Sequence, residues 1–124
     1  RGVRDVALAE RALEAARQSD VSVYAAGILG WSAEGGRHAN QVLLEQIARL
    51  TGGRAFFPEN EKQMQKAFDR IRAEIHHQYR MGYVPPSGEE GPGQWREIRV
   101  ELTRRKDLVV RCRRGYYGDR SQAP

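Results

Sequence analysis

Hydrophobic and polar positions follow two different periods along the chain, helical in the first two thirds and alternating in the last third. Apolar residues at three- and four-residue spacing predict three amphipathic helices, over residues 6–18, 38–50 and 61–79. Asp5 is placed to cap the first helix, and Asn60 with Gln63 three residues later resembles a capping box for the third. The third helix has the clearest apolar stripe, formed by Met64, Ala67, Phe68, Ile71, Ile75 and Tyr79.

Two apolar stretches between these helices predict strands. VSVYAAGIL, at residues 21–29, is rich in β-branched residues and is typical of a strand covered on both faces in a parallel sheet. In LTGGRAFFP, Gly52 or Gly53 supplies the left-handed residue that ends a helix, and residues 54–57 begin a short strand. Glycines after a helix do not make a phosphate loop, which needs them before a helix N-terminus. The order helix, strand, helix, strand, helix indicates an α/β fold.

After residue 79 the pattern becomes that of an antiparallel β unit. Residues 80–84 can be extended, and a turn-rich stretch at residues 87–94 is expected to be a mobile loop. Residues 95–103 and 108–114 both alternate between apolar and polar, and the link at 104–107 is short enough for a hairpin. We therefore expect an α/β unit over residues 1–79 and an antiparallel β extension over residues 80–124.

Composition places the chain among globular proteins. It has 124 residues, of which 40% are hydrophobic and 30% charged, and this is enough for one domain with a core. No apolar stretch approaches the roughly 20 residues that span a bilayer. The chain opens RGVRDVALAE, with neither a starting Met nor a signal peptide. We expect it to be an excerpt of a longer protein, or a processed form.

The charge balance is basic, at +5, with 18 Arg and 3 Lys. This balance permits attraction to nucleic acid, acidic lipid or acidic glycans, and it can equally reflect the composition of a GC-rich genome. Cys112 is the one cysteine, which excludes an internal disulfide and a multi-cysteine zinc site. It alternates in phase with Leu108 and Val110, so we expect a buried small hydrophobe and not a nucleophile.

Several motifs in a fixed order carry a family resemblance. SDVSVYAAGI is followed by LTGGRAFFPENEKQMQKAFDRIRAEIHHQYRMGYVPP and then by WREIRVELTRRKDLVVRCRRGYY. Together they resemble the bacterial von Willebrand factor A-related proteins typical of acidobacteria. The matching positions are Gln78-Tyr79, Gly82-Tyr83, Pro85, Arg96-Ile98-Val100 and Arg113 to Tyr117.

The resemblance implies a doubly wound (Rossmann-like) α/β fold whose ligand site is a metal-ion-dependent adhesion site. That site uses an Asp-x-Ser-x-Ser loop, a Thr and a further Asp around Mg²⁺, with one position open for a partner's carboxylate. No Asp-x-Ser-x-Ser occurs in this sequence. The chain therefore matches the C-terminal half of a von Willebrand factor A fold with an appended antiparallel β hairpin. We expect no cofactor or metal in this chain, and Mg²⁺ only where the upstream half is present.

Two alternatives stay open for the loop at residues 30–36, which follows a predicted parallel strand at its carboxyl end. This is where α/β proteins usually bind ligands, so Trp31 and Ser32 are candidate partner contacts. The alternative is an ordinary loop. The pair His76-His77 does not predict a metal site, because adjacent residues lie about 100° apart on a helix.

The basic hairpin also has two interpretations. Its cations lie near Tyr116-Tyr117, an arrangement that can bind single-stranded nucleic acid. Arginines at strand edges also prevent unwanted strand pairing, and Tyr79, Tyr83 and the Tyr116-Tyr117 pair can pack the extension onto the α/β unit. The candidate partner contacts of the hairpin are Arg104, Arg105, Lys106, Arg111 and Arg113.

Our leading hypothesis is a non-enzymatic protein–protein interaction module, since no nucleophile is paired with a base in the sequence. The alternative is a basic nucleic-acid-binding or structural domain that uses the Arg-rich hairpin. By the resemblance, the parent protein is expected outside the cytoplasm, secreted or in the cell envelope. An excerpt without its central strands leaves an open sheet edge, so we expect the isolated chain to form a homodimer or to swap elements.

Overall fold

A computed structural model describes residues 2–28, 36–86 and 93–118, and shows a small mixed α/β protein with two small sheets. Side chains within residues 2–5 and 36–39 lie outside that description. The elements in chain order are α1 (Gly2–Gln18), β1 (Tyr24–Ala26), α2 (Gly36–Thr51), β2 (Arg54–Phe56), α3 (Glu61–His76), β3 (Trp95–Glu97) and β4 (Gly115–Tyr117).

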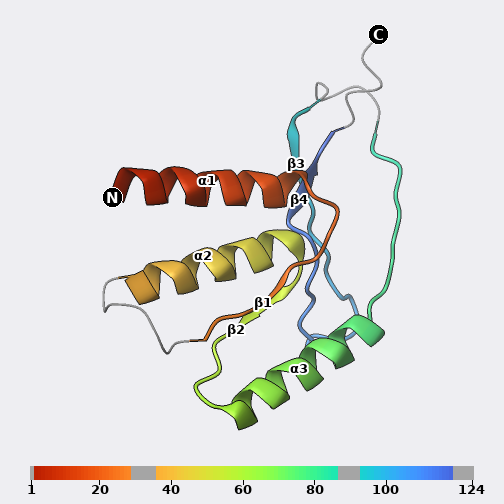
Figure 1. Ribbon diagram of the computed structural model, residues 1–124. Helices are drawn as coiled ribbons and strands as arrows, with labels where there is room; N and C mark the ends of the chain where they lie inside the picture. The colour runs from red at the N-terminus through yellow and green to blue at the C-terminus, as the bar shows by residue number, and fades with distance from the viewer. Residues whose placement is uncertain (1, 29–35, 87–92, 119–124) are drawn as a thin grey trace.

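The α/β unit is built on one pair of parallel strands. β1 pairs with β2 in the register Tyr24 to Arg54 and Ala26 to Phe56. The connecting helix α2 packs on both strands, α3 contacts β1, and these two helices lie on opposite sides of the strand pair (Figure 1). α1 lies along α2. The predicted order of helices and strands is therefore confirmed.

The TGG sequence at the end of α2 joins the helix to the first strand. Gly52 has φ +80°, the left-handed conformation predicted there. A Cβ at Gly53 would collide with the main chain of Val23, so only glycine permits this approach. The hydroxyl of Thr51 accepts a hydrogen bond from Val23 N–H at 2.9 Å and donates to Ile47 O at 3.0 Å. This segment is therefore a structural junction.

Helix α3 begins at the predicted cap and ends earlier than predicted. Asn60 Oδ1 accepts from Gln63 N–H at 2.9 Å, whereas Gln63 Oε1 accepts from Glu59 N–H, one residue before the position a capping box uses. The helix ends at His76, so the placement of Tyr79 on its stripe is wrong. The Tyr79 side chain is 93% exposed.

Two other predictions about the α/β unit are corrected. The strand predicted over residues 21–29 has strand structure only at Tyr24–Ala26, and Val21 and Ile28 are exposed. The helices α2 and α3 cover the two faces of β1 only in part, so Tyr24 and Ala25 are half-buried and Ala26 is exposed. α1 begins at Gly2, so Asp5 lies within this helix and does not cap it.

The β extension is antiparallel, as predicted, but its strands are short. β3 pairs with β4 in the register Trp95 to Tyr117 and Glu97 to Gly115, and Ile98 N–H donates to Arg114 O at 2.9 Å. The second strand follows the predicted residues 108–114 instead of including them. Residues 101–109 are all exposed, so the tip of the predicted hairpin does not pack on the α/β unit.

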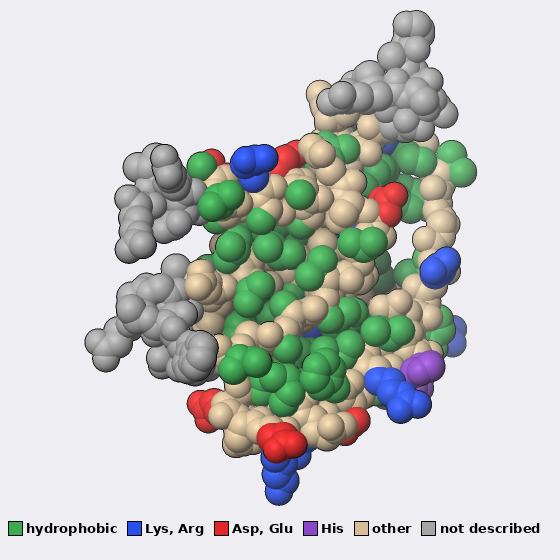
Figure 2. Space-filling model, viewed as in Figure 1, with side chains coloured by type: hydrophobic (Ala, Val, Ile, Leu, Met, Phe, Trp, Pro, Cys, Tyr) green, Lys and Arg blue, Asp and Glu red, His purple; other side chains and the backbone are tan. Residues whose placement is uncertain are grey.

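The core is small. Among the described residues, the buried hydrophobic side chains are those of Ala16, Ala48 and Ala67, and no large side chain is fully buried. Figure 2 shows hydrophobic side chains in a broad band across one face, from the region of α1 and α2 down to α3. A domain of this size ordinarily buries several large apolar side chains, whereas this face leaves apolar side chains exposed to solvent.

Candidate functional site

The β extension lies against the C-terminal ends of α1 and α2, and Arg113 holds it there. Arg113 Nη2 donates to Arg17 O at 2.6 Å, and its Nε donates to Gly115 O at 2.8 Å. The backbone N–H of Arg114 donates to Leu50 O at 3.2 Å. Arginine near a helix C-terminus satisfies carbonyls that have no partner within the helix. Arg113, a predicted partner contact, is thus occupied in capping α1.

Arg111 is also used within the molecule. Glu74 Oε1 accepts from Arg54 Nη1 at 2.8 Å and from Arg111 Nη1 at 3.2 Å. About a quarter of the Glu74 side chain is exposed, at 26%, so water screens this bridge only in part. One carboxylate therefore ties α3, β2 and the β extension together.

In the predicted turn of basic residues, one arginine forms an ion pair, and the other two cations have no partner among the described residues. Arg105 Nε and Nη2 donate to the two carboxylate oxygens of Asp107, at 2.8 and 2.7 Å. This pairing lowers the pKa of Asp107 and raises the pKa of Arg105. Arg104 and Lys106 are exposed and make no hydrogen bond or ion pair within the described ranges. Trp31 and Ser32, the other predicted contacts, lie outside the described residues.

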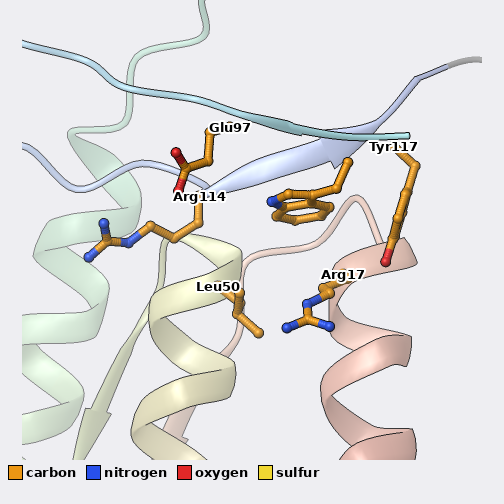
Figure 3. A pocket seen from close by; sticks show the side chains of 6 residues that line it. Arg17, Leu50, Glu97, Arg114 and Tyr117 are labelled. Atoms are coloured by element: carbon orange, nitrogen blue, oxygen red, sulfur yellow. The ribbon is translucent and has the colours of Figure 1, made fainter. Parts of the chain in front are cut away.

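A hollow of about 430 Å³ opens where the β extension meets the two helix ends (Figure 3). Its position follows from the strand register, because Trp95 and Glu97 share one face of β3 and lie opposite Tyr117 and Gly115. Gly115 leaves room for the Trp95 indole, since a Cβ there would lie 2.5 Å from the indole Cζ2. The lining residues are Arg17, Leu50, Trp95, Glu97, Arg114 and Tyr117.

Aromatic and charged groups pack together on one wall of the hollow. The rings of Trp95 and Tyr117 meet edge to face, with centroids 5.1 Å apart, and Arg17 Cζ lies 6.0 Å from the indole centroid. Tyr117 Oη lies 3.0 and 3.1 Å from the two carboxylate oxygens of Glu14 and donates to them. The hydroxyl therefore joins β4 to α1.

This hydrogen bond shifts the pKa of both Glu14 and Tyr117. It is the main cause of the lowered pKa of Glu14, with further contributions from Gln18 and Arg17. The pKa of Tyr117 is raised, first by desolvation and then by its bond to the Glu14 carboxylate. Both groups are thus held in their neutral-pH forms, the carboxylate charged and the phenol neutral.

Within the described ranges, the Glu97 carboxylate and the Arg114 guanidinium have no ion pair or hydrogen bond. With Arg17, they give the hollow two positive groups and one negative group. Such a lining can hold a charged ligand. A nucleophile–base pair is not among the six lining side chains.

Among the described residues, no group of three or more His, Cys, Asp or Glu side chains is placed to hold a metal ion. None of the described helices has both the length and the apolar character that a membrane crossing requires.

Comparison with known proteins adds no relative: no family model, no curated protein and no solved structure matches this chain. The likeness to von Willebrand factor A-related proteins thus rests on the sequence motifs alone.

Sequence reasoning did not single out the residues of the hollow. The alternation around Trp95 and Glu97 was recognised, but the strand expected to pair with it ended before Gly115. Shifting the second strand to include RRGYY would have placed Trp95 opposite Tyr117. The glycine before two aromatic residues is the sequence signal for this register. A glycine in one strand leaves space for an indole on the neighbouring strand.

Proposed function

We propose that this chain is the C-terminal part of a von Willebrand factor A-type domain that acts in protein–protein interaction and not as an enzyme. The motif order supports the family. The parallel strand pair with helices on both sides is compatible with the end of a doubly wound sheet. The proposed partner is a protein, met outside the cytoplasm.

The observation that carries this proposal is the half-covered stripe of α3. Ala67 is buried and Ile71 is half-buried, but Phe68 is 55% exposed and Ile75 is 51% exposed. An amphipathic helix of a complete domain buries its apolar stripe against a sheet. β1 has an edge without a neighbour in the described chain, so further strands there would extend the sheet. We propose that the remainder of the domain supplies them.

In this proposal the two parts of the domain have different roles. The other part supplies the oxygen ligands of Mg²⁺ and most of the recognition surface, whereas this chain supplies the last strands, the covering helices and the β extension. An open coordination position on Mg²⁺ then accepts a carboxylate of the partner.

The test is metal-dependent stability of the parent domain compared with that of this chain. Binding of Mg²⁺ to the folded state raises the unfolding temperature by mass action. We expect Mg²⁺ to raise, and EDTA to lower, the unfolding temperature of the parent domain, with no shift for the 124-residue chain. EDTA should also abolish binding of the parent protein to its partner. Partner binding that survives EDTA would contradict the proposal.

A second arm tests the apolar face itself. Phe68→Glu in the parent domain should lower the unfolding temperature strongly, because the residue would be buried there. In the 124-residue chain the same change should have little effect, since the ring is already half exposed. Ala73→Glu, which adds the same charge at an exposed position of α3, is the matched control in both proteins.

The Arg-rich hairpin gives less support to nucleic-acid binding. Three of its cations, Arg105, Arg111 and Arg113, are held by internal hydrogen bonds. Affinity for nucleic acid that falls steeply with salt would revive this alternative.

A further inference from the structure

The hairpin tip, residues 101–109, is a surface of the β extension that is held at its base and open at its end. At the base, Ile98 N–H donates to Arg114 O at 2.9 Å, and Arg111 Nη1 donates to Glu74 Oε1 at 3.2 Å. The segment between β3 and β4 runs past the end of α2 and turns back beside the C-terminal end of α3 (Figure 1). Every residue from 101 to 109 is exposed. The tip is therefore presented to solvent from a fixed base.

The unpaired charges of this tip are positive. Its acidic side chains are Glu101 and Asp107, and each makes an ion pair with an arginine, at 2.6 and 2.7 Å. Arg104 and Lys106 are exposed and have no hydrogen bond or ion pair within the described ranges. A negatively charged surface that approaches the tip would therefore meet two available cations, while both carboxylates are already neutralised by arginines.

Aliphatic side chains lie beside these cations. Leu108 is 52% exposed and Val109 is 82% exposed, and the sequence has no aromatic residue from position 98 to position 114. Single-stranded nucleic acid is bound largely by stacking of its bases on aromatic side chains, and the tip has none to offer. Aliphatic side chains next to Lys and Arg are instead typical of segments that enter the headgroup region of an anionic bilayer. The composition of the tip thus favours a lipid surface over nucleic acid.

We propose that the hairpin tip binds the surface of a bilayer that contains anionic phospholipids. Arg104 and Lys106 lie at the lipid phosphates, and Leu108 and Val109 enter the boundary between the headgroups and the acyl chains. Two cations and a small apolar area give a reversible contact, which orients the chain on the surface. This tip is a different surface from the exposed stripe of α3 and the contact needs no metal, so either proposal can fail without the other.

The test is sedimentation of the 124-residue chain with an excess of vesicles. Vesicles of phosphatidylcholine with about one third phosphatidylglycerol are compared with vesicles of phosphatidylcholine alone, at about 0.1 M salt. We expect the chain to bind the anionic vesicles with a Kd of about 1 mM accessible lipid, and the neutral vesicles at least about tenfold more weakly.

A first pair of variants tests the cations of the tip. Arg104→Gln combined with Lys106→Gln should weaken binding to the anionic vesicles about tenfold or more, because both charges act close to the lipid phosphates. Arg11→Gln combined with Lys62→Gln is the matched control, since it removes the same charge at exposed positions of α1 and α3. It should weaken binding less than about threefold, because charges far from the bilayer are screened by salt.

A second pair tests the aliphatic side chains. Leu108→Ser combined with Val109→Ser should weaken vesicle binding about tenfold or more, because less apolar surface then enters the bilayer. Val6→Ser combined with Leu8→Ser makes the same changes on α1, at side chains that are 58% and 61% exposed, and should leave the Kd unchanged. The unfolding temperature of each variant checks that its fold is retained.

Three results would overturn the proposal: no binding to either kind of vesicle, equal binding to both kinds, or binding by either tip variant that equals that of the unmodified chain. A single-stranded oligonucleotide provides the comparison with the other class of ligand. If the oligonucleotide binds through Arg104 and Lys106 while the vesicles do not bind, the tip is a nucleic-acid contact and the proposal is wrong.

Discussion

Individual arginines explain how the last third of the chain is attached to the first two thirds. Arg113 caps α1, and Arg111 shares the carboxylate of Glu74 with Arg54. Guanidinium groups suit this task because several N–H donors in a fixed plane can reach carbonyls and carboxylates of different elements together. A high arginine content is therefore partly a structural property of this fold, and only Arg104 and Lys106 of the hairpin tip stay open.

The contact between Tyr117 and Glu14 makes stability depend on pH. It holds the folded-state pKa of Glu14 below its ordinary value of 4.5, so its stabilisation is present above that pH and is lost as pH falls through the folded pKa. We expect Tyr117→Phe to lower the free energy of unfolding at pH 7. By about pH 3, the difference from the unmodified chain should be much smaller. Urea unfolding of both proteins at pH 7 and pH 3 measures this difference in the free energy of unfolding.

At high pH, the stabilisation from this contact depends on pH in the opposite direction. The pKa of Tyr117 is raised above its ordinary value of 10.0, so the stabilisation is present below that pH and is lost as pH rises through the folded pKa. Tyr79→Phe is the control, because the Tyr79 side chain is almost fully exposed. Equal differences at pH 7 and pH 3 for Tyr117→Phe would contradict the assigned role of the hydroxyl.

At the scale of elements, the ends of the helices determine how the layers meet. The end of α2, at Thr51, Gly52 and Gly53, lies close to Val23, just before β1. The backbone of Cys112 and Arg113 lies directly over Gly52. The LTGG motif thus contacts both the α/β unit and the β extension.

Gly52→Ala tests this junction. The residue has φ +80°, which L side chains rarely adopt, and a Cβ would lie 2.8 Å from the backbone nitrogen of Arg113. We expect a loss of roughly 1–2 kcal/mol or more in the free energy of unfolding, measured by urea denaturation. Gly82→Ala is the control, because nothing lies within 4 Å of a Cβ there. Similar losses for both variants would show that the junction is not special.

Asn60→Ala tests the start of α3. It removes the side-chain oxygen that accepts from Gln63 N–H, and we expect a loss of about 1 kcal/mol in the free energy of unfolding. Asn60→Asp should retain most of the stability. Asn40→Ala, inside α2 and exposed, should cause no loss. Thermal or urea unfolding of the three variants decides the point, and a neutral Asn60→Ala would refute the capping role.

Local signals predicted elements well, and long-range partners poorly. Asn60 and Gly52 were predictable because capping and left-handed turns depend on neighbouring residues alone. The length of β1 was overestimated, since an apolar run shows what a strand can bury and not how many neighbours it has. The roles of Arg111 and Arg113, and the hollow around Trp95, depend on contacts between residues far apart, which no local pattern specifies.

On the scale of the whole molecule, the chain exposes large apolar side chains of the kind that a domain usually buries. Large apolar side chains lie on α3, beside β1, and along the extended segment after α3, where Met81 and Val84 are exposed. Apolar surface of this kind promotes association with another molecule. The proposed remainder of the domain, or a second copy of this chain, can cover it.

We expect the isolated chain to associate as its concentration rises. Met81→Glu with Val84→Glu should reduce this association, because the change places charges on exposed apolar positions, and it should leave the unfolding temperature nearly unchanged. Light scattering across a concentration series measures the mass. Arg104→Glu provides a control for charge alone. A monodisperse monomer at high concentration would contradict the expectation.

The contacts between α1 and β4 have a consequence for the order of folding. Tyr117 bonds to Glu14 and Arg113 bonds to Arg17, across sequence separations of 103 and 96 residues. Because synthesis runs from the N-terminus, α1 is made well before the residues that cap it. Its terminal carbonyls therefore stay open to water until the segment around Arg113 has been made. The closure of this long loop is slow compared with local helix formation, so the contact between α1 and β4 forms late in folding.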